Sequence, residues 1–319
     1  MEKRFDVIGL GELLIDFTDA GKSAGGQRLF EQNPGGAPAN LLTAVSHMGG
    51  RTAFIGKVGA DMHGQFLKET LEGEGIDTSG LILDREVFTT LAFVGIGKNG
   101  EREFAFARKP GADTMLKPEE LKPELLKSAS VFHIGSLSLT DEPSRSATYE
   151  AVRIAKSGGA VISYDPNYRE SLWRGRDAAV SEMFKMVTHA DMMKVSDEES
   201  FLLTGLGDYR KAAQKLLTKG PALVAVTLGG DGVYVASRTG CVQVPGFQVD
   251  AVDTTGAGDS FWGGFLSRYI TCKKRPEELD KDDLTRFARF GNAVAALCVQ
   301  KRGGIPAIPT EREVERMLG

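Results

Sequence analysis

The stretch with the clearest chemical potential runs from Asp253 to Leu266. Small residues lead to a carboxylate, and the following apolar residues recur at the three- and four-residue spacing of one helix face: Phe261, Phe265, Leu266, Tyr269 and Ile270. Gly256 to Gly258 would form the turn that opens this helix, where outward-pointing backbone N–H groups can cradle a phosphate. Asp259 would lie in the first helical turn. It either accepts a proton from an attacking hydroxyl or merely complements the helix dipole.

Two further stretches carry groups suited to a ligand rich in hydroxyls. Asp16 interrupts an extended apolar run from Leu13 to Phe17, and its carboxylate could accept hydrogen bonds from adjacent hydroxyls. Downstream, the backbone exposed at the Gly-Gly turn of Gly35 and Gly36 could hold sugar hydroxyls, together with the side-chain amide of Asn40. A plain loop and helix start is the alternative for this second stretch.

A nicotinamide-binding turn is a competing interpretation of the first glycines. Gly9 and Gly11 follow a strand-like apolar run, as in a dinucleotide-binding turn. However, Leu14 occupies the position of the third glycine, which weakens that alternative.

Composition bounds the class of protein. The 319 residues fit one large α/β domain with a smaller appendage, and the net charge of -4 argues against a nucleic-acid partner. No apolar run reaches the ~18 residues that a membrane span needs, and no secretory signal opens the chain. The three scattered cysteines (Cys241, Cys272 and Cys298) form no metal or disulfide pattern, so we expect a cytoplasmic location.

The elements that position these groups follow two rhythms. From about residue 116, helical and strand patterns alternate as in a doubly wound parallel sheet, with strands expected at 131–134, 160–164, 192–195 and 222–227. Ligands bind beyond the carboxyl ends of such strands, which brings together Asp165, Asn167, Arg169, Glu199 and the turn 228–232.

The segment 87–108 has a different pattern and reads as a β-hairpin, with an Asn-Gly turn signal at Asn99. We expect a small sheet that covers the site. Arg108 ends this hairpin near the expected mouth of the pocket, or else it is an unpaired surface arginine.

Taken together, these motifs resemble the ribokinase-like (PfkB) carbohydrate kinases. The run from Asp253 to Asp259 is similar to the family's second signature, D-T-x-G-A-G-D, and Gly35, Gly36 and Asn40 match the first, G-G-x-x-x-N. The resemblance extends over essentially the whole chain, to Pro309. Three stretches are most similar to fructokinases: 11–17, 165–173 and 194–199.

The resemblance implies a fold and an activity. The fold would be α/β and ribokinase-like, with a doubly wound, mostly parallel sheet. Residues 1–319 would form a single kinase domain with a small β-sheet lid of approximately 12–33 and 87–110. The activity would be ATP-dependent phosphorylation of a sugar's primary hydroxyl, with fructose giving fructose 6-phosphate. The alternatives are a 2-keto-3-deoxygluconate kinase, another PfkB sugar kinase, or a catalytically silent sugar- or nucleotide-binding regulator.

The resemblance also implies roles for individual residues. The base would be Asp259, assisted by the N–H groups of Gly256, Ala257 and Gly258. The sugar would contact Asp16, Gly35, Gly36, Asn40, Arg108 and Arg169. ATP would contact Lys194, Thr227, Gly229, Gly232 and Asn292.

Metal ions and partners complete these expectations. Glu199 would act on Mg²⁺ through water, although Ser196 replaces the family's usual Asn. Asp253 and Thr255 would border a monovalent-cation site, where Ala307 replaces a serine found in some relatives and leaves K⁺ dependence open. The partners would be small-molecule sugar and ATP, and a homodimer could form through the lid.

Overall fold

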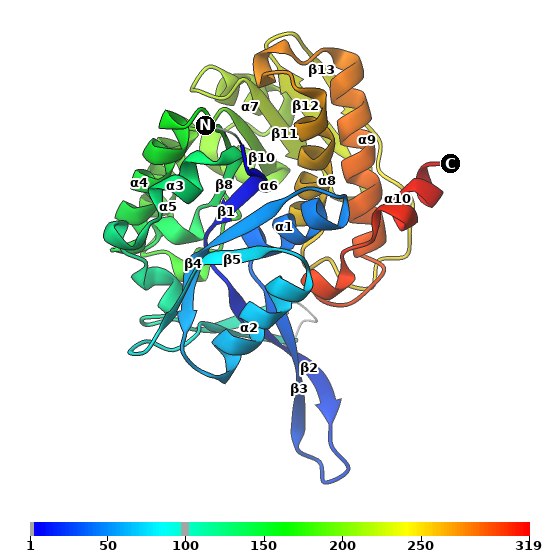
Figure 1. The fold of residues 1–319 in the computed structure, drawn as a ribbon. Helices are drawn as coiled ribbons and strands as arrows, with labels where there is room; N and C mark the ends of the chain where they lie inside the picture. Colours follow the sequence, from blue (N-terminus) through cyan, green and yellow to red (C-terminus); the bar gives the residue numbers. More distant parts are fainter. Residues whose placement is uncertain (1–2, 97–101) are drawn as a thin grey trace.

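The computed structural model describes residues 3–96 and 102–319, and within them the chain forms two sheets (Figure 1). The larger sheet has nine strands in the order β13-β12-β11-β10-β9-β8-β1-β4-β5. Six neighbouring pairs, from β11 through to β5, are parallel, while β12 and β13 add an antiparallel hairpin at one edge. Their bounds are β1 Phe5–Leu10, β4 Thr52–Gly59, β5 Asp77–Asp84, β8 Ala129–Gly135, β9 Val161–Asp165, β10 Met192–Ser196, β11 Leu223–Thr227, β12 Val233–Ser237 and β13 Gly240–Val244.

Helices cover both faces of this sheet because alternate strand residues point to opposite sides. Ile8 packs in a core with four helices: α4 Ser144–Ser157, α5 Arg176–Val187, α6 Asp197–Thr204 and α7 Tyr209–Leu217. Val7, its neighbour, packs on the other side with α1 Ala37–His47, α2 Met62–Gly73, α8 Ala257–Cys272 and α9 Lys281–Cys298. The remaining α-helices of the described residues are α3 Pro123–Lys127 and α10 Glu311–Leu318.

The smaller sheet is built from two separate segments and has the order β3-β2-β6-β7. Its strands are β2 Leu14–Lys22, β3 Arg28–Gly35, β6 Leu91–Ile96 and β7 Arg102–Ala107. β2 pairs with β3 and β6 with β7 as antiparallel hairpins, and β2 joins them by a parallel pairing with β6. The β2–β3 hairpin projects from the body of the molecule (Figure 1).

The predicted fold class is therefore confirmed, as is the hairpin expected at 87–108. The Asn-Gly turn between its strands lies outside the described residues. The four strands expected between 131 and 227 correspond to β8, β9, β10 and β11. In the part of the chain that the structure describes, no helix is long and apolar enough to cross a membrane.

Candidate active site

A cavity of about 1150 Å³ lies at the carboxyl ends of the large-sheet strands, where the small sheet meets them. Residues that follow β1, β8, β9, β10 and β11 line it, together with the first turn of α8. The small sheet contributes a second group of lining residues: Leu14, Asp16, Thr18, Asp19, Glu31, Asn33, Val94, Gly95 and Phe106. The cavity thus combines parts of the chain that are far apart in sequence.

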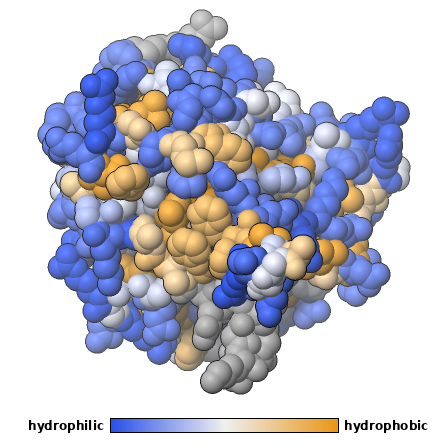
Figure 2. Space-filling model, turned by 90° about the horizontal axis from the view of Figure 1, so that it is seen from below, coloured by the Kyte–Doolittle hydropathy of each residue, from blue (hydrophilic) through white to orange (hydrophobic). Residues whose placement is uncertain are grey.

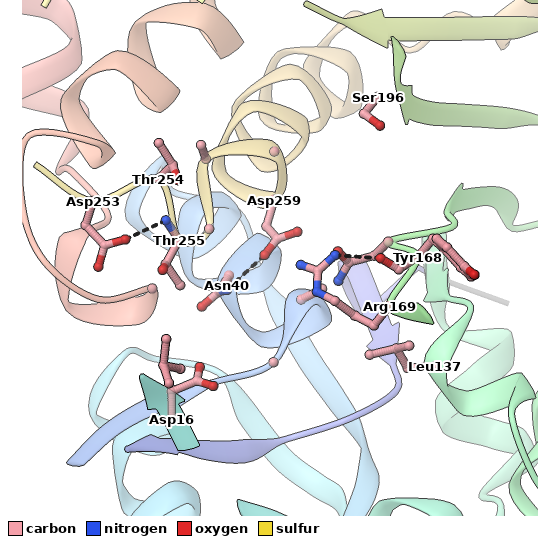
Figure 3. A pocket seen from close by; sticks show the side chains of 18 of the residues that line it. Asp16, Asn40, Leu137, Tyr168, Arg169, Ser196, Asp253, Thr254, Thr255 and Asp259 are labelled. Atoms are coloured by element: carbon pink, nitrogen blue, oxygen red, sulfur yellow. Dashed lines mark hydrogen bonds between the residues drawn. The ribbon is translucent and has the colours of Figure 1, made fainter. Parts of the chain in front are cut away.

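Asp259 lies in the first turn of α8, as predicted, and its side chain is almost fully buried. The Asn40 amide, three residues into α1, donates a hydrogen bond of 2.9 Å from Nδ2 to Asp259 Oδ2 (Figure 3). α1 and α8 pack side by side, with Leu41 and Ala44 directly against Gly263. Helix packing therefore brings two predicted site residues, 219 positions apart, into direct contact.

The electrostatic surroundings of Asp259 suit a proton acceptor. Burial and the nearby Asp165 carboxylate raise the pKa of Asp259, whereas Lys194, the Asn40 hydrogen bond and Arg169 lower it, leaving a pKa of about 6. A carboxylate with this pKa is ionised at neutral pH and is a stronger base than an ordinary aspartate. These surroundings fit the general-base interpretation, which stays a prediction beside dipole compensation.

The turn before α8 is shaped by its glycines and by Asp253. Gly256 adopts φ 74°, a left-handed conformation that favours glycine. Asp253 accepts backbone N–H groups from Thr255 at 2.8 Å and from Gly303 at 3.1 Å, which ties the turn to the loop before α10. The Ala257 N–H donates to the Thr254 carbonyl at 3.2 Å, so this amide has a partner within the turn.

Lys194 lies beside this turn. Its Nζ forms an ion pair of 2.8 Å with Asp165 Oδ2, and it lies 2.7 Å from where a Cβ on Gly258 would be. Burial alone would lower the pKa of Lys194, but Asp165, Glu199 and Asp259 raise it above its ordinary value. A charged ammonium therefore adjoins the first turn of α8, where a phosphate would be bound.

Asp16 projects from the small sheet and faces the same open space as Asp259 and Arg169 (Figure 3). Burial raises the pKa of Asp16 to about 6; Arg169 opposes this shift, and Asp253 and Asp259 add to it. A Cβ on Gly35 would lie 2.3 Å from Asp16 Oδ2, so a larger residue there would displace the Asp16 carboxylate.

The neighbouring Gly36 adopts φ 126°. A Cβ on Gly36 would lie 2.3 Å from the Glu12 carbonyl oxygen, so any residue with a side chain would clash with the backbone there. The two glycines of the predicted turn thus permit two close contacts.

Gly11 also permits a close contact. A Cβ there would lie 2.7 Å from Pro38 Cγ, so the space beside this glycine is occupied by protein, which does not support the nicotinamide alternative.

Of the predicted ATP contacts, Lys194, Thr227 and Gly229 line the cavity, but Gly232 and Asn292 do not. Gly232 adopts φ 97°, and a Cβ there would lie 2.2 Å from the Val244 carbonyl oxygen. Asn292 Nδ2 donates to the carbonyls of Val244 and Pro245 at 3.2 and 3.0 Å. Both residues therefore shape the loops beside the cavity.

Arg108 lies behind the cavity lining and not in it, which corrects its expected place at the mouth. It forms an ion pair of 2.7 Å with Asp113, and both side chains are almost completely buried. Its guanidinium also donates to Thr140 Oγ1 at 2.9 Å and to the Leu137 carbonyl at 2.8 Å. Since Leu137 lines the cavity, Arg108 supports the lining from behind.

Glu12 and Asn33 are two of the polar lining residues that were not predicted. Glu12 is buried beside the Gly-Gly turn, where its Oε1 accepts the Ala37 N–H at 2.9 Å, and burial raises its pKa to about 7. Asn33 lies on β3 and donates to Thr18 Oγ1 at 3.3 Å. The signal for Glu12 was the one used for Asp16, an acid within a largely apolar run.

This arrangement is that of a carbohydrate kinase, and the chain belongs to the pfkB family of carbohydrate kinases, whose profile matches residues 5–311. Among curated proteins, the chain is 44% identical over 316 residues to fructokinase-1 of Zea mays, covering 98% of this chain and 97% of that one. The prediction of a PfkB sugar kinase is therefore confirmed.

Solved structures agree. The fructokinase of Xylella fastidiosa with bound ATP has a TM-score of 0.90 at 34% identity, covering 98% of both chains. The fructokinase of Vibrio cholerae O395 in a form that binds fructose, ADP and calcium ion has a TM-score of 0.87 at 31% identity, covering 99% of both chains.

Proposed function

We propose that this protein transfers the γ-phosphoryl group of ATP to the primary hydroxyl of fructose, giving fructose 6-phosphate and ADP. The observation that carries the proposal is the buried Asp259 at the start of α8, in a cavity whose other lining groups suit hydroxyls and phosphates. The similar fructokinases with ATP, or with fructose and ADP, support the same choice of substrates.

In this mechanism the protein supplies alignment and charge stabilisation. Asp259 accepts the proton from the attacking hydroxyl, and Asn40 orients the Asp259 carboxylate through their hydrogen bond. Lys194 and the backbone of Gly256, Ala257 and Gly258 stabilise charge on the transferring group. Asp16, Asn40 and the turn at Gly35 and Gly36 hold the sugar hydroxyls, with Arg169 at the phosphates. Thr227 and Gly229 contact ATP, and Gly232 and Asn292 shape the adjoining loops.

Cations form part of the proposal. Glu199 is a buried carboxylate in the cavity wall, which fits a group that holds Mg²⁺ through a water molecule. When bound, Mg²⁺ neutralises phosphate charge. The Asp253 carboxylate accepts the N–H groups of Thr255 and Gly303 and so lies beside the backbone of two loops. A carboxylate beside backbone carbonyls would suit a monovalent cation such as K⁺.

The small sheet is proposed as a lid over the sugar, built from residues of approximately 12–33 and 87–110 within one kinase domain of residues 1–319. It contributes Asp16 and Asn33 to the cavity, so closure would place these groups on the sugar and exclude water. Backbone amide exchange in β2 and β6 should slow when saturating fructose is added, and unchanged exchange would count against a lid.

A homodimer through this lid is also proposed. Phe17, Phe30 and Phe93 pack together on the small sheet, and Phe30 and Phe93 remain more than one third exposed. Apolar side chains also gather on the face of the molecule shown in Figure 2. Light scattering of the wild type and of Phe30→Glu tests this pairing, which predicts a dimer that the charge disrupts.

A reducing, cytoplasmic location is proposed because all three cysteines are free.

A coupled assay of ADP release over a panel of sugars tests the activity. Asp16 lines the cavity at the proposed sugar position, and its negative charge would repel a substrate carboxylate placed close to it. We therefore expect kcat/KM for fructose to exceed that for 2-keto-3-deoxygluconate by more than ~10-fold, about 1.4 kcal/mol of transition-state binding. A preference for the keto acid would overturn the choice of sugar and leave the kinase mechanism in place.

A further inference from the structure

The loop that presents Arg169 to the cavity adopts an unusual backbone conformation. It leaves β9 at Asp165, and Asn167 has φ 44°, a left-handed conformation that few residues other than glycine and asparagine adopt readily. Asp165 Oδ1 accepts the Asn167 N–H at 3.1 Å, which holds the first part of the loop. Arg169 itself is exposed, and its Nη1 donates to the Tyr168 carbonyl at 2.9 Å (Figure 3). The position of Arg169 therefore depends on the backbone of Tyr168.

Glu199 holds that backbone. Its Oε1 accepts the Tyr168 N–H at 2.7 Å, and its Oε2 accepts the Ser196 N–H at 2.8 Å. Ser196 Oγ accepts the Glu199 N–H at 3.0 Å in return, which forms a capping box at the start of α6. With both oxygens bonded and the side chain buried, the Glu199 carboxylate fixes the Arg169 loop relative to β10, the strand that carries Lys194.

We propose that Glu199 is a positioning residue for Arg169, which it holds over the cavity through the backbone of Tyr168. The catalytic consequence rests on the proposed phosphoryl transfer, but the structural link does not. Each carboxylate oxygen can accept a second hydrogen bond, so this role adds to the proposed contact with metal-bound water.

The structural link is tested without substrate or metal, by amide hydrogen exchange of the segment 166–173 in the ligand-free protein. Glu199→Ala should speed exchange at Tyr168 by about 10-fold or more, because it removes the only acceptor described for that N–H among residues 3–96 and 102–319. Ser196→Ala is the matched control: it removes the α6 cap but leaves the Tyr168 bond, so exchange should stay at the wild-type rate. Wild-type exchange in Glu199→Ala overturns the proposal.

Glu199→Gln provides a second variant that preserves side-chain shape, should Glu199→Ala fail to fold. Its NH2 group replaces one of the two carboxylate oxygens and cannot accept, so one of the two N–H groups loses its acceptor and exchange at Tyr168 should fall between the wild type and Glu199→Ala. Exchange as slow as in the wild type, with the Ser196 amide also protected, would contradict the proposed link.

The functional consequence has a readout that simple loss of structure would not produce. Arg169 favours the ionised form of Asp259, together with Lys194 and against Asp165; Asp16 and Cys298 also interact electrostatically with Asp259. Displacing Arg169 should therefore move the acidic limb of the kcat/KM profile to higher pH. Direct loss of the Glu199 negative charge would move it to lower pH, so the direction separates the two effects.

Arg169→Ala and Glu199→Ala should each raise that limb, and the double variant should raise it no further than Arg169→Ala does. An additive shift, or a shift to lower pH in Glu199→Ala, overturns the positioning role. Absence of kinase activity in the wild type would reject the proposed function and leave the exchange result unaffected.

Discussion

Two buried ion pairs differ in their position relative to the cavity lining and in whether their cation can still contact a ligand. Arg108 and Asp113 lie behind the lining, where Arg108 also bonds Thr140 and the Leu137 carbonyl, and Asp113 accepts from Thr90. In the second pair, Lys194 lines the cavity next to the first turn of α8 and forms its ion pair with Asp165. Both pairs are less than one tenth exposed.

The difference teaches that burial and pairing by themselves do not identify a functional charge. A cation whose donors are all directed at protein acceptors stabilises structure, whereas one beside an open phosphate cradle can stabilise charge on a ligand. The first two predictions separate the region behind the cavity lining from the region that faces the cavity, and the last two concern groups that face it.

The largest effect is expected from Arg108→Met. Removing the cation leaves the buried Asp113 carboxylate uncompensated, which should lower the free energy of unfolding by about 3–5 kcal/mol. Urea unfolding measures this. Arg169→Met is the matched control, because it removes an exposed cation and should change stability by no more than about 0.5 kcal/mol. Equal losses in the two variants would remove the distinction between the regions.

Asp259→Asn should have the opposite profile, with turnover reduced by at least about 100-fold and the fold intact. The pKa of Asp259 is raised in the folded protein, so its ionised form opposes folding at neutral pH, and thermal stability of the variant should hold or rise. Asp282→Asn is the control, since Asp282 is an exposed acid in the first turn of α9. Turnover within a few-fold of the wild type, or a loss of stability alone, would favour dipole compensation.

Asp16→Ala tests the part of the cavity that comes from the small sheet. Loss of a carboxylate that orients the sugar should lower kcat/KM for fructose by about 10-fold or more, because positioning contributes to the chemical step. ATP binding, measured by calorimetry, should stay close to the wild type, since the nucleotide loop lies on the large sheet. An equal loss of ATP affinity would show that Asp16 supports the cavity as a whole.

The last prediction concerns pH. Asp259 and Asp16 each have a raised pKa of about 6, and Asp259 has to be ionised to accept a proton. The kcat/KM for fructose should therefore fall as pH decreases through about 6, in a steady-state profile from pH 4.5 to 8. Asp16→Asn removes one of the two groups and separates their contributions. An acidic limb near pH 4 would mean that neither carboxylate is perturbed in the working enzyme.

Local sequence was sufficient to predict α8, the alternating strands and helices after residue 116, and part of the cavity lining. Other lining residues, such as Lys194 and Thr227, were expected only from the resemblance to the PfkB family. The period of apolar residues after Gly258 predicts α8, and the small residues before it predict a turn that admits an anion, because both depend only on neighbouring residues. The alternation of strands and helices after residue 116 predicts a doubly wound sheet, whose topology brings Asp165, Arg169 and Glu199 to one edge.

Only the tertiary structure decided which charges face the cavity. Arg108 and Arg169 both follow strands and look equivalent in sequence. However, Arg108 is buried because it bonds to Asp113, Thr140 and the Leu137 carbonyl. The contact of Asn40 with Asp259, and of Glu199 with Tyr168, likewise depends on how distant helices and loops pack. The physical reason is that a side chain's pKa and accessibility depend on every neighbour in space, and most of those neighbours are remote in the chain.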